Sequence, residues 1–178
     1  HACGLHGDGE VECWGLDQYG ETTPQAGPFE RISVGNGHNC AQRADDTILC
    51  WGNDGNGQLG APAIPVLQVT CGYYHTCALH LDGSIECWGN DGHGQASNTP
   101  EGAFVQIDGG WRHNCAVADD AAVAGWGPDA EGQANHPGGT LSQASADRNP
   151  SSAVHPSRTL ASSAPAPGAQ PPTPTFPS

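Results

Sequence analysis

Basic side chains are nearly missing from this sequence of 178 residues. It holds no lysine and five arginines against 19 acidic residues, so its formal net charge at pH 7 is −14. Proteins that bind nucleic acid or an anionic membrane surface need basic side chains to replace counterions. We therefore expect no nucleic-acid partner and no attraction to such a membrane.

Long apolar runs are also missing. The longest apolar stretches have the length of a β-strand, well short of the ~20 residues of a membrane-spanning helix, so we expect no membrane insertion. Hydrophobic residues make up only 36% of the chain, while glycine occurs 26 times. One short unit of this composition cannot bury enough surface, so we expect stacked units and disulfides to supply the stability.

Signatures of catalysis are missing as well. Serine is sparse before residue 137, and no Gly-x-Ser-x-Gly motif occurs. Covalent catalysis needs a nucleophile, a base and a group that orients the base, and we find no such set. We predict a non-catalytic protein without a cofactor. A polysaccharide hydrolase, the weakest alternative, would need a carboxylate pair at glycosidase separation.

What the sequence does contain is a repeat of about 37 residues. A histidine precedes the first cysteine of each copy by two positions, and a Trp-Gly pair follows, then a second glycine beside Glu or Gln. Four concordant copies with this period predict stacked β-units of a propeller or solenoid. The first cysteines are Cys3, Cys40, Cys77 and Cys115, and the tryptophans are Trp14, Trp51, Trp88 and Trp126.

The stretch from Cys77 to Gly89 is the clearest copy. An Asp-Gly pair between two short apolar runs predicts a hairpin. A three-residue loop at 81–83, with Gly83 in the left-handed conformation, places His80 opposite Ser84. Cys77 then faces Cys87 in the pair type where side chains approach most closely, within reach of a disulfide.

The same spacing pairs Cys3 with Cys13 and Cys40 with Cys50. Cys115 faces Gly125 instead, and Cys71 also lacks a hairpin partner. These two residues are a candidate fourth pair that bridges neighbouring units; they could also stay buried thiols or pair between chains. Cysteines in bridging positions indicate an oxidising compartment, so we expect the protein outside the cell or at its surface.

The loops before the repeated histidines break the symmetry of the repeat. They hold Asn36-Gly37, Tyr73-Tyr74 or Trp111-Arg112, all expected on one face. Aromatic and arginine side chains on loops favour contacts with protein or sugar. The alternative is that they only cap the edges of the units. The candidate binding residues are Tyr73, Tyr74, Trp111 and Arg112.

Metal binding is disfavoured. The His-x-Cys pairs resemble zinc ligands, but zinc sites need ligands that converge from two places, and most of these cysteines already have partners. We expect the histidines to hydrogen-bond their own loops, after a glycine with positive φ. The loops 53–58 and 90–95 lack the bidentate glutamate of a calcium loop.

Two regions differ in composition. Residues 1–136 carry the four repeats, whereas residues 137–178 are rich in Pro, Ser, Ala and Thr. Such a segment favours an extended polyproline conformation over a packed core. It resembles hydroxyproline-rich and mucin-like stalks. The candidate O-glycosylation sites are Ser162, Ser163, Thr173 and Thr175.

The pattern Gly-x-x-His-x-Cys-Ala-Leu at 72–79, followed by Asp-Gly and Cys-Trp-Gly at 82–89, resembles the regulator of chromosome condensation repeat. So does the stretch from Cys50 to Gly60, which ends in Gly-Gln-Leu-Gly. The paired cysteines resemble its secreted variety. The resemblance implies a β-propeller with four-stranded blades, usually seven in a ring, that serves as a platform for protein binding.

We therefore expect an all-β propeller-type array of about four blades, incomplete or open, with an extended tail. Four repeats cannot close a seven-bladed ring, so the chain is either a fragment or is completed by another chain. The leading hypothesis is an extracellular structural glycoprotein that packs with copies of itself or another extracellular protein, in a filament or surface coat. The alternative is a monomeric module of a larger secreted protein that recognises protein or glycans.

Overall fold

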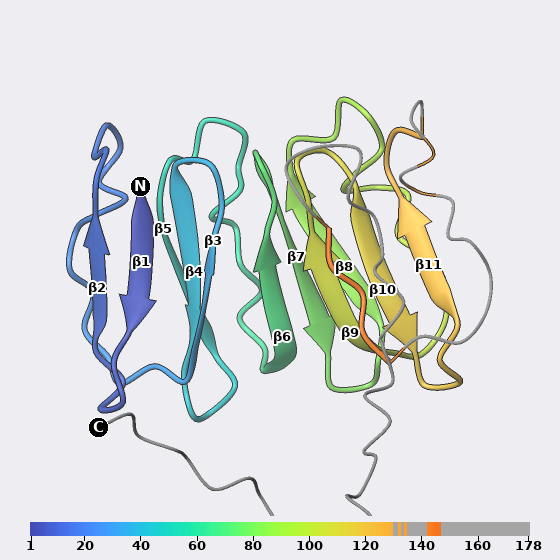
Figure 1. Cartoon of the computed structure of the whole chain (residues 1–178), viewed down its shortest axis with the longest axis horizontal. Coiled ribbons are helices and arrows are strands. Elements are labelled where there is room, and N and C mark those ends of the chain that lie inside the picture. The colour runs from blue at the N-terminus through green and yellow to red at the C-terminus, as the bar shows by residue number, and fades with distance from the viewer. Residues whose placement is uncertain (130–131, 133, 135–141, 147–178) are drawn as a thin grey trace, which may run out of the picture.

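Four small antiparallel sheets stand side by side in sequence order (Figure 1). The computed structural model describes residues 1–129, 132, 134 and 142–146. It confirms the predicted all-β array of about four blades. The first blade has β1 (Ala2–Leu5) and β2 (Val11–Trp14); the second has β3 (Arg31–Val34), β4 (His38–Gln42) and β5 (Ile48–Gly52); the third has β6 (Val66–Cys71), β7 (His75–His80) and β8 (Ile85–Gly89); the fourth has β9 (Phe104–Gly109), β10 (Asn114–Ala118) and β11 (Val123–Trp126).

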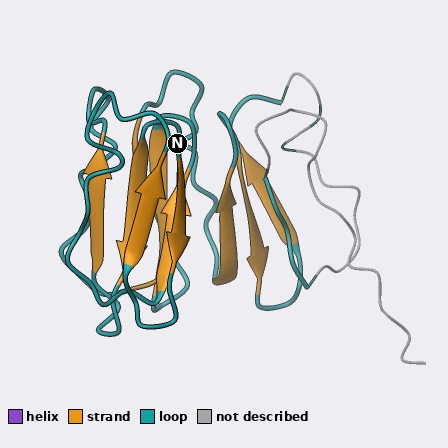
Figure 2. Ribbon diagram, turned by 60° about the vertical axis from the view of Figure 1, so that its left-hand side comes forward, coloured by secondary structure: helices purple, strands orange, loops and turns teal. Residues whose placement is uncertain are grey.

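Blades 2, 3 and 4 share one strand order, in which the middle strand pairs antiparallel with the strand before it and the strand after it. We call the first strand of each blade, β3, β6 or β9, its inner strand. The inner strands of adjacent blades contact one another, and the sheets stand face to face when the molecule is turned (Figure 2). In the part of the chain that the structure describes, no helix is long and apolar enough to cross a membrane.

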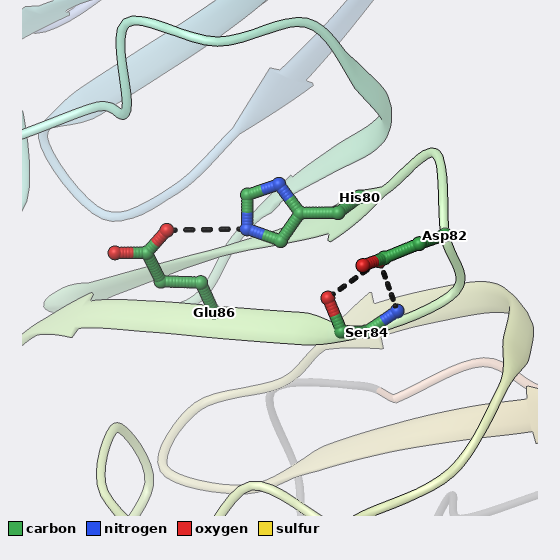
Figure 3. Close-up of polar contacts among 4 residues, drawn as sticks. All are labelled: His80, Asp82, Ser84 and Glu86. Carbon is green, nitrogen blue, oxygen red and sulfur yellow. Dashed lines mark hydrogen bonds and ion pairs between the residues drawn. The ribbon is translucent and has the colours of Figure 1, made fainter.

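The hairpin of blade 3 has the predicted register. The His80 N–H donates to the Ser84 carbonyl at 2.9 Å, and Gly83 has φ of 85°. Asp82 caps the turn, because its carboxylate accepts from the backbone N–H of Ser84 at 3.0 Å and from its hydroxyl at 2.6 Å (Figure 3). Cys77 lies directly opposite Cys87.

Three disulfides close the hairpins of blades 1 to 3: Cys3–Cys13, Cys40–Cys50 and Cys77–Cys87. The candidate fourth pair is not formed, since Cys71 and Cys115 are both free, buried thiols. Cys71 packs with Cys40 and Val69, whereas Cys115 packs in a separate cluster with Val117, Val123 and Ala144. The two thiols belong to different inter-blade layers, which is why they do not bridge.

Within the described residues, blade 1 has two strands and blades 2, 3 and 4 have three strands each, instead of the four that the family resemblance implies. After the last strand of blades 1, 2 and 3, the chain runs through a series of turns to the next blade. In blade 2, Asn53 accepts from the Gly55 N–H at 2.7 Å and Asp54 accepts from the Leu59 N–H at 2.9 Å. These side-chain bonds hold the backbone in turns. We call the segments 15–30, 53–65 and 90–103 the crossing loops.

The glycine of each Gly-x-x-His motif differs from the prediction. Gly35 and Gly72 are not among the residues with positive φ. Their role is to leave space, because a Cβ on Gly72 would lie 2.1 Å from Cε1 of His75, and one on Gly35 would lie 2.5 Å from Cε1 of His38. The glycine is required by the imidazole ring packed against it.

Apolar side chains are buried between blades. Leu79 of blade 3 packs with Phe104, Ile107 and Trp126 of blade 4. Val11 of blade 1 packs in the same way with residues of blade 2. Each blade therefore completes its core only with a neighbour, as expected for stacked repeats.

Residues 142–146 continue the array beyond β9. The side chain of Gln68 on β6 bonds both backbone groups of Ile107 on β9, at 2.7 and 3.0 Å. Gln106 on β9 makes the same two bonds to Ala144, at 2.8 and 3.2 Å. Ala144 is 2% exposed. These residues thus lie against β9 in the way that β9 lies against β6, although their composition matches the Ser- and Ala-rich tail.

Candidate recognition site

The repeated histidines connect neighbouring blades. The Nε2 atom of His38 lies 3.0 Å from the Thr76 hydroxyl, and that of His75 lies 2.7 Å from Oδ1 of Asn114. His1 makes the equivalent contact with Asn39 at 2.8 Å. The sequence predicted a bond within the histidine's own loop, but the partner is the middle strand of the next blade.

Burial favours the neutral form of the imidazoles of His38, His75 and His113. It lowers the pKa of His38 from 6.5 to about 4, and it also lowers the pKa values of His75 and His113, since a charged ring is costly away from water. Within the described residues, no three His, Cys, Asp or Glu side chains converge on a point where a metal ion could sit. The histidines serve the packing of blades.

The tryptophans of blades 2, 3 and 4 form a second connection, to the Glu or Gln that follows the second glycine of the preceding repeat. The indole N–H of Trp88 donates to the backbone carbonyl of Gln58 in the preceding crossing loop at 2.9 Å, and the Thr76 hydroxyl donates to the same carbonyl at 2.9 Å. Trp51 and Trp126 bond Glu21 and Gln95 in the same way, each at 3.1 Å. The shared motif is therefore structural, and recognition has to come from residues that the repeats do not share.

Such residues surround a cavity of about 350 Å³ at one end of the inner strands. Equivalent segments of three blades line it: Val34–Asn36, Cys71–Tyr73 and Gly109–Trp111. His1 and Ala146 complete the wall. We call this space the aromatic cavity, after Tyr73 and Trp111.

The aromatic side chains form one cluster. The ring centroids of Tyr73 and Tyr74 lie 4.3 Å apart and those of Tyr73 and Trp111 lie 5.5 Å apart, both edge to face. The Tyr73 N–H donates to the Trp111 carbonyl at 3.3 Å. Trp111 is still 37% exposed and Tyr74 is 36% exposed. The cluster is held in place while two of its rings remain open to solvent.

The four sequence-predicted binding residues therefore lie together, although they differ in position. Tyr73 and Trp111 line the aromatic cavity, whereas Tyr74 and Arg112 stand beside it. The Arg112 guanidinium lies 4.8 Å from the Trp111 ring centroid, and its Nη1 is 3.1 Å from Nε2 of His93. The arginine covers one side of the indole.

The lining of the aromatic cavity is close to neutral. Among the described residues that line it, none is an aspartate, glutamate, lysine or arginine. Burial raises the pKa of the Cys71 thiol to about 12, so this sulfur stays protonated and is a poor nucleophile. A hydrogen bond with Tyr73 raises the pKa of the Tyr74 hydroxyl beside the cavity. The surroundings suit an uncharged ligand.

Sequence reasoning missed several lining residues, among them Val34, Cys71 and Ala146. Val34, Cys71 and Gly109 are equivalent positions of successive repeats, so the repeat register could have grouped them. Ala146 carried no such signal. The candidate glycosylation sites Ser162, Ser163, Thr173 and Thr175 lie outside the described residues.

Polar residues also meet at the hairpin of blade 3, in an arrangement unlike a catalytic triad. The hydroxyl of Ser84 donates to Asp82, while Nε2 of His80 lies 3.1 Å from Glu86 (Figure 3). The histidine ring therefore contacts a carboxylate on β8 and not the serine hydroxyl. Asp45 and Thr47 repeat the turn contact in blade 2, at 2.6 Å, which identifies it as turn chemistry.

The comparison with protein families agrees with this architecture. The sequence model of the Regulator of chromosome condensation (RCC1) repeat matches residues 29–58 and 66–95. A search of curated proteins finds no match.

Several solved structures are similar. The entire ectodomain of the receptor kinase CR4 from Physcomitrella patens is 28% identical, with a TM-score of 0.67 over 81% of this chain and 43% of that one. The CRINKLY WD40 ectodomain of the receptor kinase ACR4 from Arabidopsis thaliana is 23% identical, with a TM-score of 0.63 over 82% and 52%. Prp20p from Saccharomyces cerevisiae is 19% identical, with a TM-score of 0.61 over 70% and 42%. The chain thus spans about half the length of these proteins.

Proposed function

We propose that this chain, which is built of RCC1-type propeller repeats, is a non-catalytic extracellular module that recognises protein segments at its aromatic cavity. The observation that carries this proposal is the cluster of Tyr73, Tyr74 and Trp111 around a concave, nearly neutral site. Binding energy in protein recognition is concentrated in such aromatic residues, particularly when a rigid framework holds them.

The framework around this site is rigid because hydrogen bonds join its blades to one another. Tyr73 and Trp111 sit on short loops between an inner strand and a middle strand, and blade 3 is bonded to blade 4 through His75 and to blade 2 through Trp88. Binding residues on loops that a stable scaffold positions are a recurrent arrangement. Ordering of the site therefore costs little free energy on binding.

Three disulfides support the extracellular part of the proposal, because such bonds persist in oxidising compartments. The similar chain from Physcomitrella patens is itself the ectodomain of a receptor kinase. Expression in a secreting host, followed by a count of free thiols, tests whether exported protein has two thiols and three bridges.

A phage-displayed library of random peptides tests the recognition function without knowledge of the natural partner. We expect the full chain to enrich peptides that a variant with alanine at Tyr73, Tyr74, Trp111 and Arg112 fails to retain. Trp14→Ala is the matched control, since Trp14 is 56% exposed and belongs to the third-strand position of blade 1. Equal enrichment by the fourfold variant would contradict the proposal.

Packing into an assembly is a second candidate function. It is favoured by the way the blades stack, since Leu79 of blade 3 packs with Phe104, Ile107 and Trp126 of blade 4. A second copy or another extracellular protein could stack in the same way, as in a filament or coat. Light scattering of the purified chain at increasing concentration tests the idea, and a monomer throughout would reject it. Intact mass of the C-terminal peptide tests whether Ser162, Ser163, Thr173 and Thr175 carry sugars.

A further inference from the structure

We propose that the aromatic cavity binds a proline-rich segment in the polyproline II conformation, and that its occupant is this chain's own residues 164–177. This inference rests on the proposed recognition function and names the ligand for it. Residues 164–177 contain six prolines, at positions 165, 167, 171, 172, 174 and 177.

The first argument is the chemistry of the wall. Proline-rich segments dock in grooves lined by aromatic rings, because the polyproline helix is preformed and loses little entropy on binding. Tyr73 and Trp111 present such rings, with their centroids 5.5 Å apart and their planes at 67°. A proline ring can pack against the exposed indole while a neighbouring ring contacts Tyr73.

The second argument is an unused hydrogen-bond donor. Backbone carbonyls of a polyproline helix have no internal partners, so a receptor needs N–H donors for them. The indole N–H groups of Trp51, Trp88 and Trp126 all donate to crossing loops. That of Trp111 makes no hydrogen bond to any described residue, and the ring is 37% exposed. This donor is free to bond a ligand carbonyl.

Charge is the third argument. The chain carries a formal net charge of −14, yet residues 159–178 contain no acidic or basic side chain. An uncharged segment is not repelled by the acidic molecule, and it matches a cavity whose described lining residues include no aspartate, glutamate, lysine or arginine. An acidic peptide would be repelled in the same place.

The path of the chain is the fourth argument. Ala146, the last described residue, lines the aromatic cavity, and the Ala146 N–H donates to Asp108 of β9 at 2.7 Å. Only seventeen residues, 147–163, separate it from the proline-rich segment. A chain of that length reaches at most ~60 Å, so the segment cannot start farther than this from the aromatic cavity. Linkage of this kind raises the effective concentration to roughly the millimolar range.

The consequence is competition. If the proline-rich segment occupies the aromatic cavity, then an external partner has to displace it. The segment acts as a built-in competitor that lowers the apparent affinity for outside ligands in proportion to its occupancy.

The experiment follows the indole N–H signal of Trp111 in the full-length 15N-labelled chain, assigned with Trp111→Phe. The tail variant replaces Pro165, Pro167, Pro171, Pro172 and Pro174 with alanine. We expect its Trp111 signal to differ from that of the native chain. A free peptide of residues 162–178 should move the signal of the tail variant back to the native position.

Alanine variants locate the contact. In the tail variant, Tyr73→Ala should weaken peptide binding at least about tenfold, whereas Trp14→Ala should leave it within about twofold. The native signal should not depend on protein concentration, because the occupant belongs to the same chain.

Three outcomes would overturn the proposal. The first is a Trp111 signal that does not move when ~2 mM peptide is added. A dissociation constant above this concentration would make the segment too weak to compete with an external partner. The second is equal weakening by Trp14→Ala. The third is a concentration-dependent native signal, which would assign the occupant to a second copy. Library enrichment of peptides without proline, together with any of these, would leave the recognition function standing and reject only this inference.

Discussion

Single residues in the hairpin turns show where backbone conformation, and not side-chain identity, is fixed by the fold. The third residue of the turn is left-handed in all four blades, with φ of 88° at Gly9, 63° at Asp46, 85° at Gly83 and 66° at Ala121. Only glycine adopts this conformation without strain. Blades 2 and 4 therefore keep a shape that their residue at this position does not favour.

The first prediction concerns this turn position. Ala121→Gly should raise the free energy of unfolding by about 1 kcal/mol, because it relieves a strained φ. Gly83→Ala should lower it by roughly 1–3 kcal/mol, since a Cβ there would also lie 3.0 Å from the backbone nitrogen of Phe104. Urea unfolding midpoints measure both changes.

Gly7→Ala is the control for these turn variants. Gly7 lies in the same kind of hairpin loop, has no positive φ, and a Cβ on it would meet nothing within 4 Å. We expect little change in the midpoint. Stabilisation by Gly83→Ala, or loss of stability in Ala121→Gly, would show that the turn is not strained as described.

The second prediction is a loss of stability on mild acidification. Burial lowers the pKa of His38 to about 4, with His75 adding to the effect and Asp54 opposing it. The unfolded chain therefore binds more protons than the folded one between about pH 6.5 and 4, so stability is complete above this window and falls as pH decreases through it. His38 alone accounts for a loss of up to roughly 3 kcal/mol in the free energy of unfolding across this window.

Urea unfolding between pH 7 and 4.5 tests this window. The pKa values of Asp45, Asp82 and Asp91 are lowered from 3.8, first of all by side-chain hydrogen bonds, so these carboxylates act only at lower pH. His38→Gln should flatten the profile while His75 and His113 keep part of its slope. A native profile without slope in this range would refute the explanation.

At the scale of the element, the hairpins were predictable and the crossing loops were not. Two cysteines ten residues apart around an Asp-Gly turn allow one register, and the register of Cys77 with Cys87 follows from it. In the crossing loops, Asn, Asp and Gly are compatible with many turns. The resemblance suggested a fourth strand there, but side-chain bonds such as Asn53 to Gly55 hold turns instead.

The third prediction concerns a hairpin disulfide. Replacement of both Cys77 and Cys87 by alanine should cost about 2.5–3 kcal/mol, the chain-entropy value for a loop of this length. Loss of a core sulfur adds to this, because Cys77 is fully buried. Chemical unfolding of the double variant provides the measurement.

Cys71→Ala is the matched comparison, since it removes a buried thiol that forms no bridge. It should cost only the packing of one sulfur, about 1 kcal/mol. If both variants lost the same stability, the cross-link itself would contribute nothing and the role assigned to it would be wrong.

For the whole molecule, the sequence was sufficient to predict the number of blades but not the contacts between them. Period and motif indicated four units, whereas the bonds of His38 and Trp88 to a neighbouring blade, and their equivalents in other blades, required coordinates. The position of residues 142–146 in the array could not be predicted for a different reason. Their Ser and Ala content resembles the tail, while Gln106 of β9 supplies the hydrogen bonds that position Ala144. The aromatic cavity could not be predicted either, because segments of three blades form its wall.

The fourth prediction tests whether blades stabilise one another. Trp51→Phe removes the indole donor that bonds the Glu21 carbonyl at 3.1 Å, at a cost of about 1 kcal/mol. Hydrogen–deuterium exchange should accelerate in the crossing loop 15–30 of blade 1, although the substitution lies in blade 2. Faster exchange confined to blade 2 would argue against coupling through this bond.

The joints between blades all have the same polarity. A blade offers its histidine and its crossing-loop carbonyl to the blade that follows, and presents its Thr or Asn and its tryptophan to the blade that precedes. Such head-to-tail interfaces do not close on themselves in pairs. A gene that duplicated one repeat in tandem would therefore produce a unit that fits at both of its ends. Tandem duplication alone can therefore produce arrays of different length, and it requires no new type of contact between blades.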